Sequence, residues 1–288
     1  MIEAIFHYEF LRNTLITGLL IGLIAPLLGT FIVVRRLSLI ADALSHVTLA
    51  GIATSLFFSK QWSAFAGLNP LYFGLGFSVL GSLLIERLRL VYKHYQELAI
   101  PIIMSGGIGV SVIFISLADG FNTDLFSYLF GSVSAVSRTD LYLILAITIF
   151  VGALIIFLYK ELFLLSFDEE HAKVSGIPAR VIHFLFMLMT ALVIAASMRI
   201  VGILLVSALM TLPVAASMRI ARGFKQTIGL SILLGEISVI GGLISAYYLD
   251  LAPGGTIVVL SIFILLFVIL FKRMRAKGII GKQRGESQ

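Results

Sequence analysis

The chain contains no cysteine among its 288 residues, and it has few charged side chains. Without cysteine it can form neither a disulfide nor a metal site with thiolate ligands. Charged residues make up 12% of the sequence, whereas soluble domains carry about 25%. Hydrophobic residues make up 59%, and the mean hydropathy is +1.08. These proportions exclude an ordinary soluble protein and indicate a membrane protein.

Motifs of nucleotide-dependent and metal-dependent catalysis are also absent. The sequence has no G-x-x-x-x-G-K-[ST] loop, so it cannot bind ATP through a P-loop, and it has no H-E-x-x-H pair. The net charge of +6 calls for no nucleic-acid partner, because much of it lies in a basic tail at about residues 272–288. We therefore expect no enzyme activity and no permanently bound cofactor. Any energy for transport would come from another chain or from an ion gradient.

Long apolar runs recur along the whole chain and predict a single polytopic α-helical transmembrane domain, residues 1–288, surrounded by lipid. Residues 119–139 read as a short outer excursion or half-helix. The pattern predicts nine crossings, or eight if one segment is re-entrant. The expected spans are about 13–34, 38–58, 64–85, 98–118, 140–159, 180–199, 201–221, 226–249 and 254–271.

The distribution of basic residues predicts which ends of these spans face the cytoplasm. By the positive-inside rule, the basic tail is a cytoplasmic anchor, which places the C-terminus inside and, with nine crossings, the N-terminus outside. Arg138 and Arg199 then fall on the outer side, against the general trend.

A carboxylate and an imidazole lie four residues apart within the second apolar run. Asp42 and His46 share one face of a helix because positions i and i+4 are neighbours on its surface. Ionisable groups at membrane depth are costly and usually belong to a pathway or a ligand site. An oxygen and a ring nitrogen together suit a divalent first-row metal. The alternative from spacing alone is a hydrogen-bonded pair that ties two helices together.

Three further polar residues in the apolar runs have either a functional or a structural interpretation. Ser45 lies between the pair and is a weaker candidate for the pathway. Glu236 is a lone carboxylate near mid-depth, either a packing residue or a pathway group. His183, near the cytoplasmic start of its helix, reads as an interfacial or core histidine.

The longest polar interior stretch, at about residues 160–179, is either a solvated loop or a short helix. The helical interpretation has Asp168 as N-cap, Glu169 and Glu170 in the first turn, Gly176 as the stop and Pro178 beyond it. A short helix on the cytoplasmic face could dock into the cleft of a partner.

Three segments carry a resemblance to a known family. Residues 35–46 resemble the R-R-x-S-L-x-x-D-x-L-S-H signature of membrane permeases from bacterial ABC importers of zinc, manganese or iron. Residues 199–213 are similar to the family's R-x-V-G-x-L-L-V-x-A-L-x-x-x-P segment. Residues 168–176 look like its cytoplasmic coupling helix.

The resemblance implies a type II ABC importer-like permease in the bacterial cytoplasmic membrane. It would act as a homodimer with two cytoplasmic ABC ATPase subunits, fed by an extracellular metal-binding lipoprotein or periplasmic binding protein. It implies that Asp42 and His46 are the transit ligands. The ATPase-coupling residues it implies are Asp168, Glu169, Glu170, Ala172 and Gly176.

Zn²⁺ is the favoured substrate, with Mn²⁺ or Fe²⁺ as alternatives within the family. The residues before Asp42 and after His46 look more like those of zinc-type members, since manganese-type members tend towards G-D before the A-L-S-H and L-P-G after it. Zinc also binds nitrogen and oxygen ligands more tightly than manganese. Two hypotheses from other classes are a proton-coupled secondary metal carrier, with Glu236 and Asp42 as relays, and a non-transporting scaffold.

Overall fold

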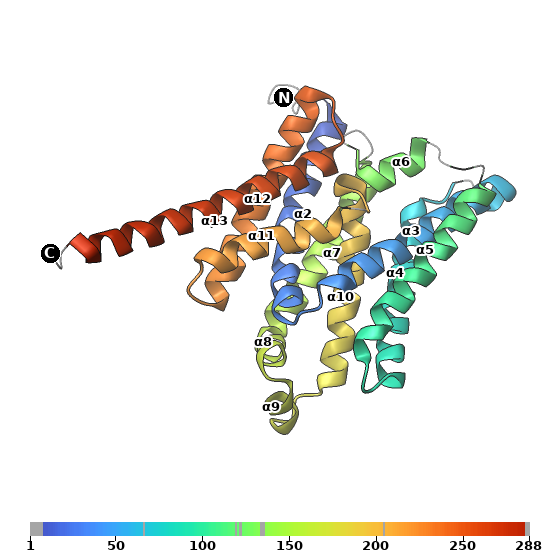
Figure 1. Ribbon diagram of the computed structural model, residues 1–288. Coiled ribbons are helices and arrows are strands. Elements are labelled where there is room, and N and C mark those ends of the chain that lie inside the picture. The colour runs from blue at the N-terminus through green and yellow to red at the C-terminus, as the bar shows by residue number, and fades with distance from the viewer. Residues whose placement is uncertain are drawn as a thin grey trace.

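Every element that the structure describes is helical. The structure, a computed structural model, describes residues 8–65, 67–118, 120, 123–132, 136–203 and 205–285, without the side chains of residues 64, 123–124 and 275–285. The α-helices, shown in Figure 1, are α2 (Glu9–Val34), α3 (Ser38–Gln61), α4 (Pro70–Val91), α5 (Ala99–Leu117), α6 (Thr123–Phe130), α7 (Arg138–Phe157), α8 (Tyr159–Phe167), α9 (Glu169–Val174), α10 (Ala179–Val201), α11 (Val206–Ile220), α12 (Phe224–Leu249) and α13 (Pro253–Gly285). Short 3-10 turns occupy Ser63–Phe65 and Gln96–Leu98.

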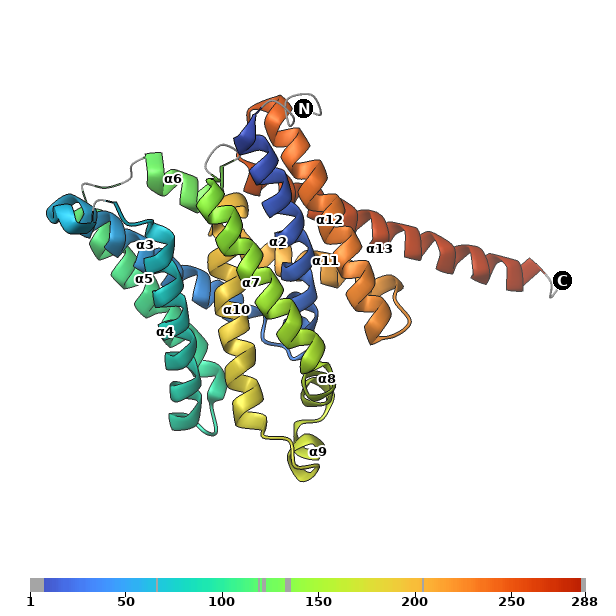
Figure 2. The ribbon, with the colours of Figure 1, turned by 180° about the vertical axis from the view of Figure 1, so that it is seen from behind.

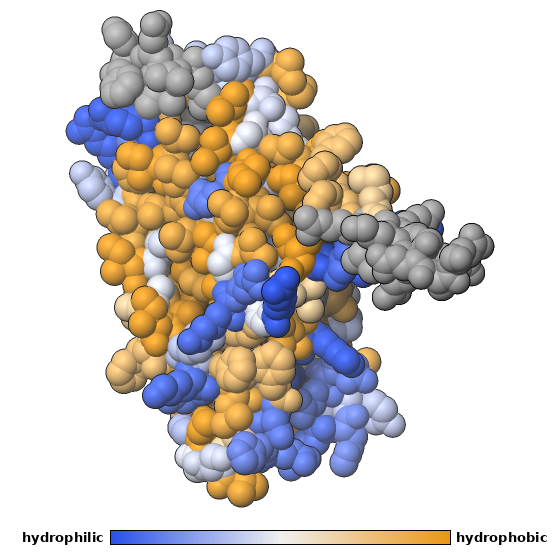
Figure 3. Space-filling model, turned by 90° about the vertical axis from the view of Figure 1, so that its left-hand side faces the viewer, coloured by the Kyte–Doolittle hydropathy of each residue, from blue (hydrophilic) through white to orange (hydrophobic). Residues whose placement is uncertain are grey.

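Eight of the described helices are long and apolar enough to cross a membrane: α2, α3, α4, α5 with the turn before it, α7, α10, α12 and the first part of α13. The sides of the molecule are hydrophobic, whereas hydrophilic residues gather towards the end that carries α9 (Figure 3). An apolar band between polar ends is typical of a protein that spans a bilayer. The prediction of an all-helical membrane protein is confirmed.

The chain passes back and forth between an end that carries α6 and an end that carries α9 (Figures 1 and 2). At the α9 end, Phe224 of α12 packs on Phe31 of α2 and Phe163 of α8, with ring centroids 5.2 Å apart in both pairs. At the α6 end, a Cβ on Gly254 of α13 would lie 2.8 Å from the carbonyl oxygen of Phe130. The N-terminal end of α2 lies away from α9, so α2, α4 and α7 run towards the α9 end, and α3, α5, α10 and α12 run away from it.

The span expected at 201–221 is shorter in the structure than predicted. α10 continues to Val201, and Gly202, with φ of +82°, turns the chain against α6, where the Ile203 amide donates to the Tyr128 carbonyl at 2.9 Å. The remaining helix α11 has 15 residues, about 22 Å of helix, against a hydrocarbon core of about 30 Å. It is the segment that separates a count of eight from a count of nine.

Two other predicted boundaries were wrong. The span expected at 64–85 begins at Pro70, where the Asn69 side chain accepts from the Leu71 amide at 3.0 Å and proline takes the first helical position. The last helix, expected to end near 271, continues to Gly285. The outer excursion at 119–139 contains α6, while residues 119, 121–122 and 133–135 lie outside the described part.

Helix α3 is held between α4 and α5 by contacts at glycines (Figure 2). A Cβ on Gly107 of α5 would lie 2.9 Å from the Val47 amide nitrogen of α3. A Cβ on Gly51 of α3 would lie 2.5 Å from the Phe73 carbonyl oxygen of α4. Only residues without a side chain allow backbones to approach this closely. The helix that carries Asp42 and His46 is therefore tightly fixed on two sides.

Candidate functional site: a carboxylate–imidazole pair on α3

Asp42 and His46 are the partly exposed positions on a stretch of α3 that is otherwise buried. Both side chains are half-buried, whereas Ala41, Leu44 and Val47 are buried. Their spacing places them on adjacent turns of one helix face. The structure therefore keeps the two candidate ligands together and accessible, as the sequence predicted, although their role in metal transit stays a prediction.

His46 borders a hollow of about 510 Å³ between α3, α5 and α6. The Ser111 hydroxyl of α5 donates to the Gly107 carbonyl at 2.6 Å and also lies 3.3 Å from the His46 carbonyl oxygen, so α5 holds the backbone beneath the ring. The other lining residues are apolar: Leu49, Ile108, Val112, Ile115, Phe126, Leu129 and Phe130. Asp42 does not line this hollow, so the pair borders it through His46 alone.

Ser45 does not share the open face of the pair. It is 3% exposed, and its hydroxyl donates to the Ala41 carbonyl at 2.8 Å within α3. Hydroxyls of this kind commonly satisfy themselves on the preceding turn of a helix. The structure thus gives Ser45 a helix-internal partner and leaves Asp42 and His46 as the accessible polar pair.

Glu236 lies on a different helix interface from the pair. Its carboxylate packs over Gly22 of α2, where an added Cβ would lie 3.1 Å from Oε2, and that oxygen is buried with no hydrogen-bond partner among the described residues. α12 packs mainly on α2, α11 and α13, whereas α3 packs mainly on α4 and α5, with smaller contacts to α11 and α10. The structure does not bring Glu236 to Asp42 and His46.

One chain supplies a small ligand set. Among the described residues, no group of three or more histidine, aspartate or glutamate side chains is arranged to hold a metal ion. Asp42 and His46 provide two ligands, so water, backbone carbonyls or another copy of the chain would complete a shell of four or more.

The polar stretch at 160–179 forms two helices, α8 and α9. The predicted short helix is present as α9: the Asp168 side chain accepts from the His171 amide at 2.8 Å, and Gly176 ends the turn with φ of +80°. Ala172 is fully buried, so it anchors α9 to the protein. The Glu170 side chain is exposed on the surface of α9. The helix has the shape expected of a coupling element; its coupling role is untested.

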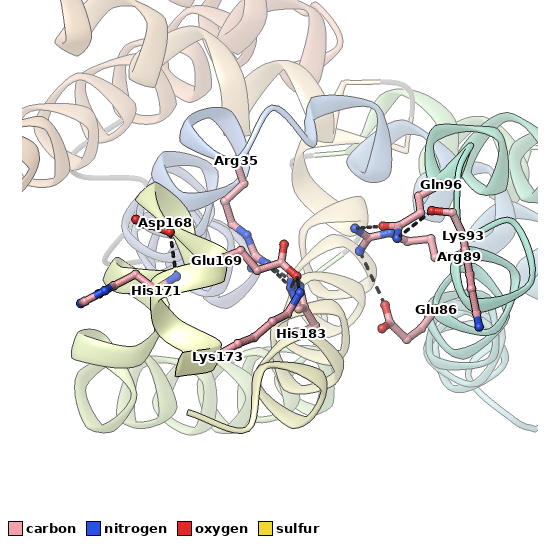
Figure 4. Close-up of polar contacts among 10 residues, drawn as sticks. All are labelled: Arg35, Glu86, Arg89, Lys93, Gln96, Asp168, Glu169, His171, Lys173 and His183. Carbon is pink, nitrogen blue, oxygen red and sulfur yellow. Dashed lines mark hydrogen bonds and ion pairs between the residues drawn. The ribbon is translucent and has the colours of Figure 1, made fainter. Parts of the chain in front are cut away.

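A polar cluster joins α9 to the membrane helices, and our sequence reasoning missed it (Figure 4). Arg35, between α2 and α3, donates through Nη2 to the His183 ring of α10, and His183 Nε2 lies 3.7 Å from Glu169 Oε1. Lys173 donates to the same Glu169 oxygen at 2.7 Å, which holds the pKa of the Glu169 carboxyl below its usual range. Burial, reinforced by the nearby Arg89 charge, lowers the pKa of Arg35 to about 10.

A second buried polar network surrounds Arg199 near the α6 end of the molecule. Asp140 is fully buried, and its Oδ2 lies 3.5 Å from Arg199 Nε while its Oδ1 accepts from Asn69 at 2.7 Å. The Arg199 guanidinium also lies 4.6 Å from the ring centroid of Tyr128. Ser137 and Asp140 form a capping box at the start of α7, a motif that the sequence displays. Arg199 therefore has a buried carboxylate as a structural partner.

Comparison with known proteins identifies the family to which this sequence is similar. Residues 7–272 match the ABC 3 transport family. The manganese import system permease protein ScaB of Streptococcus gordonii is 33% identical, over 96% of this chain and 97% of that protein. The high-affinity zinc uptake system membrane protein ZnuB of Haemophilus influenzae is 32% identical, over 93% of this chain and 99% of that protein.

A solved structure shares the fold as well as the sequence. The structure of PsaBC from Streptococcus pneumoniae in complex with Fab is 31% identical, covers 93% of both chains and superposes with a TM-score of 0.79. Both the sequence match and the shared helical architecture extend over nearly the whole chain. The chain is therefore a member of the ABC 3 transport family, and it resembles membrane components of metal uptake systems.

Proposed function

We propose that the chain is the membrane permease of an ATP-driven importer of a divalent metal ion, with Zn²⁺ as its substrate. The observation that carries the proposal is the half-exposed Asp42–His46 pair on the otherwise buried α3. A buried charged group with no structural partner would only cost stability, whereas a carboxylate and an imidazole at membrane depth bind a passing metal ion.

The family and the small ligand set together support the expected partners. The relatives are named as membrane components of transport systems, and this sequence has no P-loop of its own. ATP would therefore be hydrolysed by cytoplasmic subunits that contact α9, and an extracellular binding protein would deliver the metal. Two copies of the chain would form the pathway, with the C-terminus in the cytoplasm.

The choice of zinc rests on ligand chemistry. A manganese relative and a zinc relative have nearly the same identity to this chain, 33% and 32%, so sequence identity to these two does not distinguish the metals. One imidazole and one carboxylate bind zinc more tightly than manganese by the Irving–Williams order. A shell with only two ligands from each chain also lets the ion leave, which transport requires.

Metal uptake by substituted permeases tests the proposal. Cells lacking the permease receive wild type, Asp42→Ala, His46→Ala or, as the matched control, Ser45→Ala, at equal membrane levels, and uptake of radiolabelled zinc and manganese is measured. We expect zinc uptake to be lost in the first two variants and kept in Ser45→Ala, since its hydroxyl bonds within α3.

Each other outcome has a defined meaning. Rescue of manganese uptake alone would overturn the metal and keep the site. Normal uptake by both ligand variants would refute the site. Uptake that persists without an ATPase subunit but stops with an uncoupler would identify a proton-coupled carrier instead.

A further inference from the structure

Arg35 connects the α9 end of the molecule to the start of the candidate ligand helix. Only Arg35, Arg36 and Leu37 separate α2 from α3, and the Leu37 amide donates back to the Ile32 carbonyl at 2.9 Å. Arg36 adopts φ of +58°, a conformation that side chains rarely adopt. The hydrogen bonds of this connection tie it to the last turn of α2, and only three residues join it to α3, so a shift of Arg35 moves the end of α2 and, through the short connection, the first turn of α3. Asp42 follows one turn later.

The Arg35 side chain is held by residues of α10. Its guanidinium carbon lies 4.7 Å from the ring centroid of Phe186, and Nη2 contacts both nitrogens of His183, Nδ1 more closely and Nε2 at 3.2 Å. Arg35 Nη1 is buried with no hydrogen-bond partner among the described residues. His183 therefore supplies the hydrogen-bond acceptor that fixes this guanidinium.

The chemistry of the two side chains determines which of them donates in the contact between Arg35 and His183. Arginine can only donate, so the His183 nitrogen nearest to it, Nδ1, accepts and carries no proton. The other ring nitrogen, Nε2, lies 3.7 Å from Glu169 Oε1, which is close contact but longer than a hydrogen bond. The ring joins a cation at the start of α3 to a carboxylate on α9. Figure 4 shows Arg35, His183, Glu169 and Lys173 converging, while His171 points to the other side of α9.

The charged groups around the ring keep Glu169 ionised. Lys173 donates to its carboxylate from the next turn of α9, and Arg89 of α4 faces the same groove of about 490 Å³. Glu86, which lines the same groove, lies beside Arg89, with Oε2 3.6 Å from Arg89 Nη1. His183 itself is 8% exposed, so the contacts that it makes are shielded from water and strengthened.

We propose that His183 is a positioning residue that links the coupling helix to the metal ligands: the chain Glu169–His183–Arg35 makes α9 and the first turn of α3 move as one body. The inference rests on the proposed function and adds to it the route by which α9 acts on Asp42 and His46. Displacement of α9 by an ATPase subunit would pull on Glu169, and the relay would carry the displacement to α3 without passing through the lipid-facing helices.

Transport per ATP hydrolysed tests the relay in the complete importer. His183→Leu introduces an apolar side chain of similar size and removes the contacts with both Arg35 and Glu169. We expect it to lower metal transported per ATP by about fivefold, with ATP hydrolysis retained. His183→Gln, whose carboxamide both accepts and donates, should recover this ratio to within about twofold of wild type. The control His94→Leu removes an exposed histidine at the same end and should match wild type.

A distance measurement tests the relay without any transport. Because the chain has no cysteine, Leu39→Cys and Val174→Cys create the sole spin-label sites, on exposed positions of α3 and α9. In the purified permease, with labelled chains diluted by unlabelled copies, we expect a narrow distance distribution for wild type. With His183→Leu it should broaden, and with His183→Gln it should stay narrow.

These results separate the relay from the proposed function. Equal distributions in wild type and His183→Leu, or equal transport per ATP, would overturn the relay. Equal losses in His183→Leu and His183→Gln would show a packing role and also overturn it. A wild-type importer that moves no metal would refute the proposed function, whereas the spin-label distances would still decide whether the relay exists.

Discussion

The contact between α5 and α3 at Gly107 predicts a specific effect of adding one methyl group. A Cβ at this position would lie 2.9 Å from the Val47 amide nitrogen and 3.1 Å from the His46 carbonyl carbon, where ordinary contact begins near 3.4 Å. With Gly107→Ala the two helices must separate by about 0.5 Å, since neither obstacle is a movable side chain end. The displaced backbone is that of His46 itself.

A matched control lies one residue earlier on the same helix. Gly106 is exposed, and a Cβ there would meet nothing within 4 Å. Both alanine variants gain the same helix propensity, about 1 kcal/mol, so this gain cancels when they are compared. What remains is the overpacking cost at Gly107, about 1–3 kcal/mol. Gly107→Ala should therefore unfold more easily than Gly106→Ala by that amount.

Two assays check the reasoning. Thermal unfolding of the purified permease should give a lower midpoint for Gly107→Ala than for Gly106→Ala. Zinc affinity, measured by competition with a chelator, should fall by about tenfold in Gly107→Ala, because groups that orient a metal ligand typically contribute at least that much. If both variants match in stability and in zinc affinity, then the α3–α5 contact does not position His46, and the argument fails.

Three further predictions concern groups away from the pair. Glu236→Gln should keep metal uptake, because the carboxylate packs over Gly22 rather than beside the pair; loss of uptake would return Glu236 to the pathway. Asp168→Ala removes the N-cap of α9 and should weaken that helix by about 1 kcal/mol, seen as faster amide exchange at residues 169–174. Acid should have a similar effect: the Lys173 hydrogen bond lowers the pKa of Glu169, so its stabilisation is present above the ordinary glutamate pKa and is lost as pH falls below about 4. Unchanged protection of α9 at that pH, after correction for intrinsic exchange rates, would contradict this.

The features that could be predicted from sequence are those with a local signal. Apolar runs predicted the membrane helices, and of the two alternatives left open for residues 160–179, a loop or a short helix, the N-cap at Asp168 and the stop at Gly176 indicated the helix that the structure contains as α9. The start of α4 also has a local sequence signal, an N-cap at Asn69 followed by proline. We placed the start too early because the residues before Asn69 are also apolar. The end of α10 was predicted within two residues of Val201, but the start of α11 at Val206 was not, because Gly202 and Ile203 are held against α6, a contact between distant parts of the chain.

The polar clusters could not be predicted because their partners are distant in the chain. His183 meets Arg35, which lies 148 residues earlier, and Asp140 meets Asn69 over a separation of 71 residues. Hydropathy and spacing report on one helix at a time, so each residue looked isolated. Asp42 and His46 could be found because both candidate ligands lie on one helix, within a single turn of each other.

Helix α3 both carries the candidate ligands and connects to the polar cluster at α9. Its middle carries the candidate ligands and is fixed by glycine contacts to α4 and α5, while its first turn is joined through Arg35 to α10 and α9. A helix packed this closely has little freedom for local side-chain adjustment. The backbone beneath the two candidate ligands should therefore move with α3 as a body, together with α4 and α5. Alternating access in this protein should then appear as movement of that three-helix unit relative to α2, α11, α12 and α13, and spin-label distances within α3, α4 and α5 should stay constant through the transport cycle.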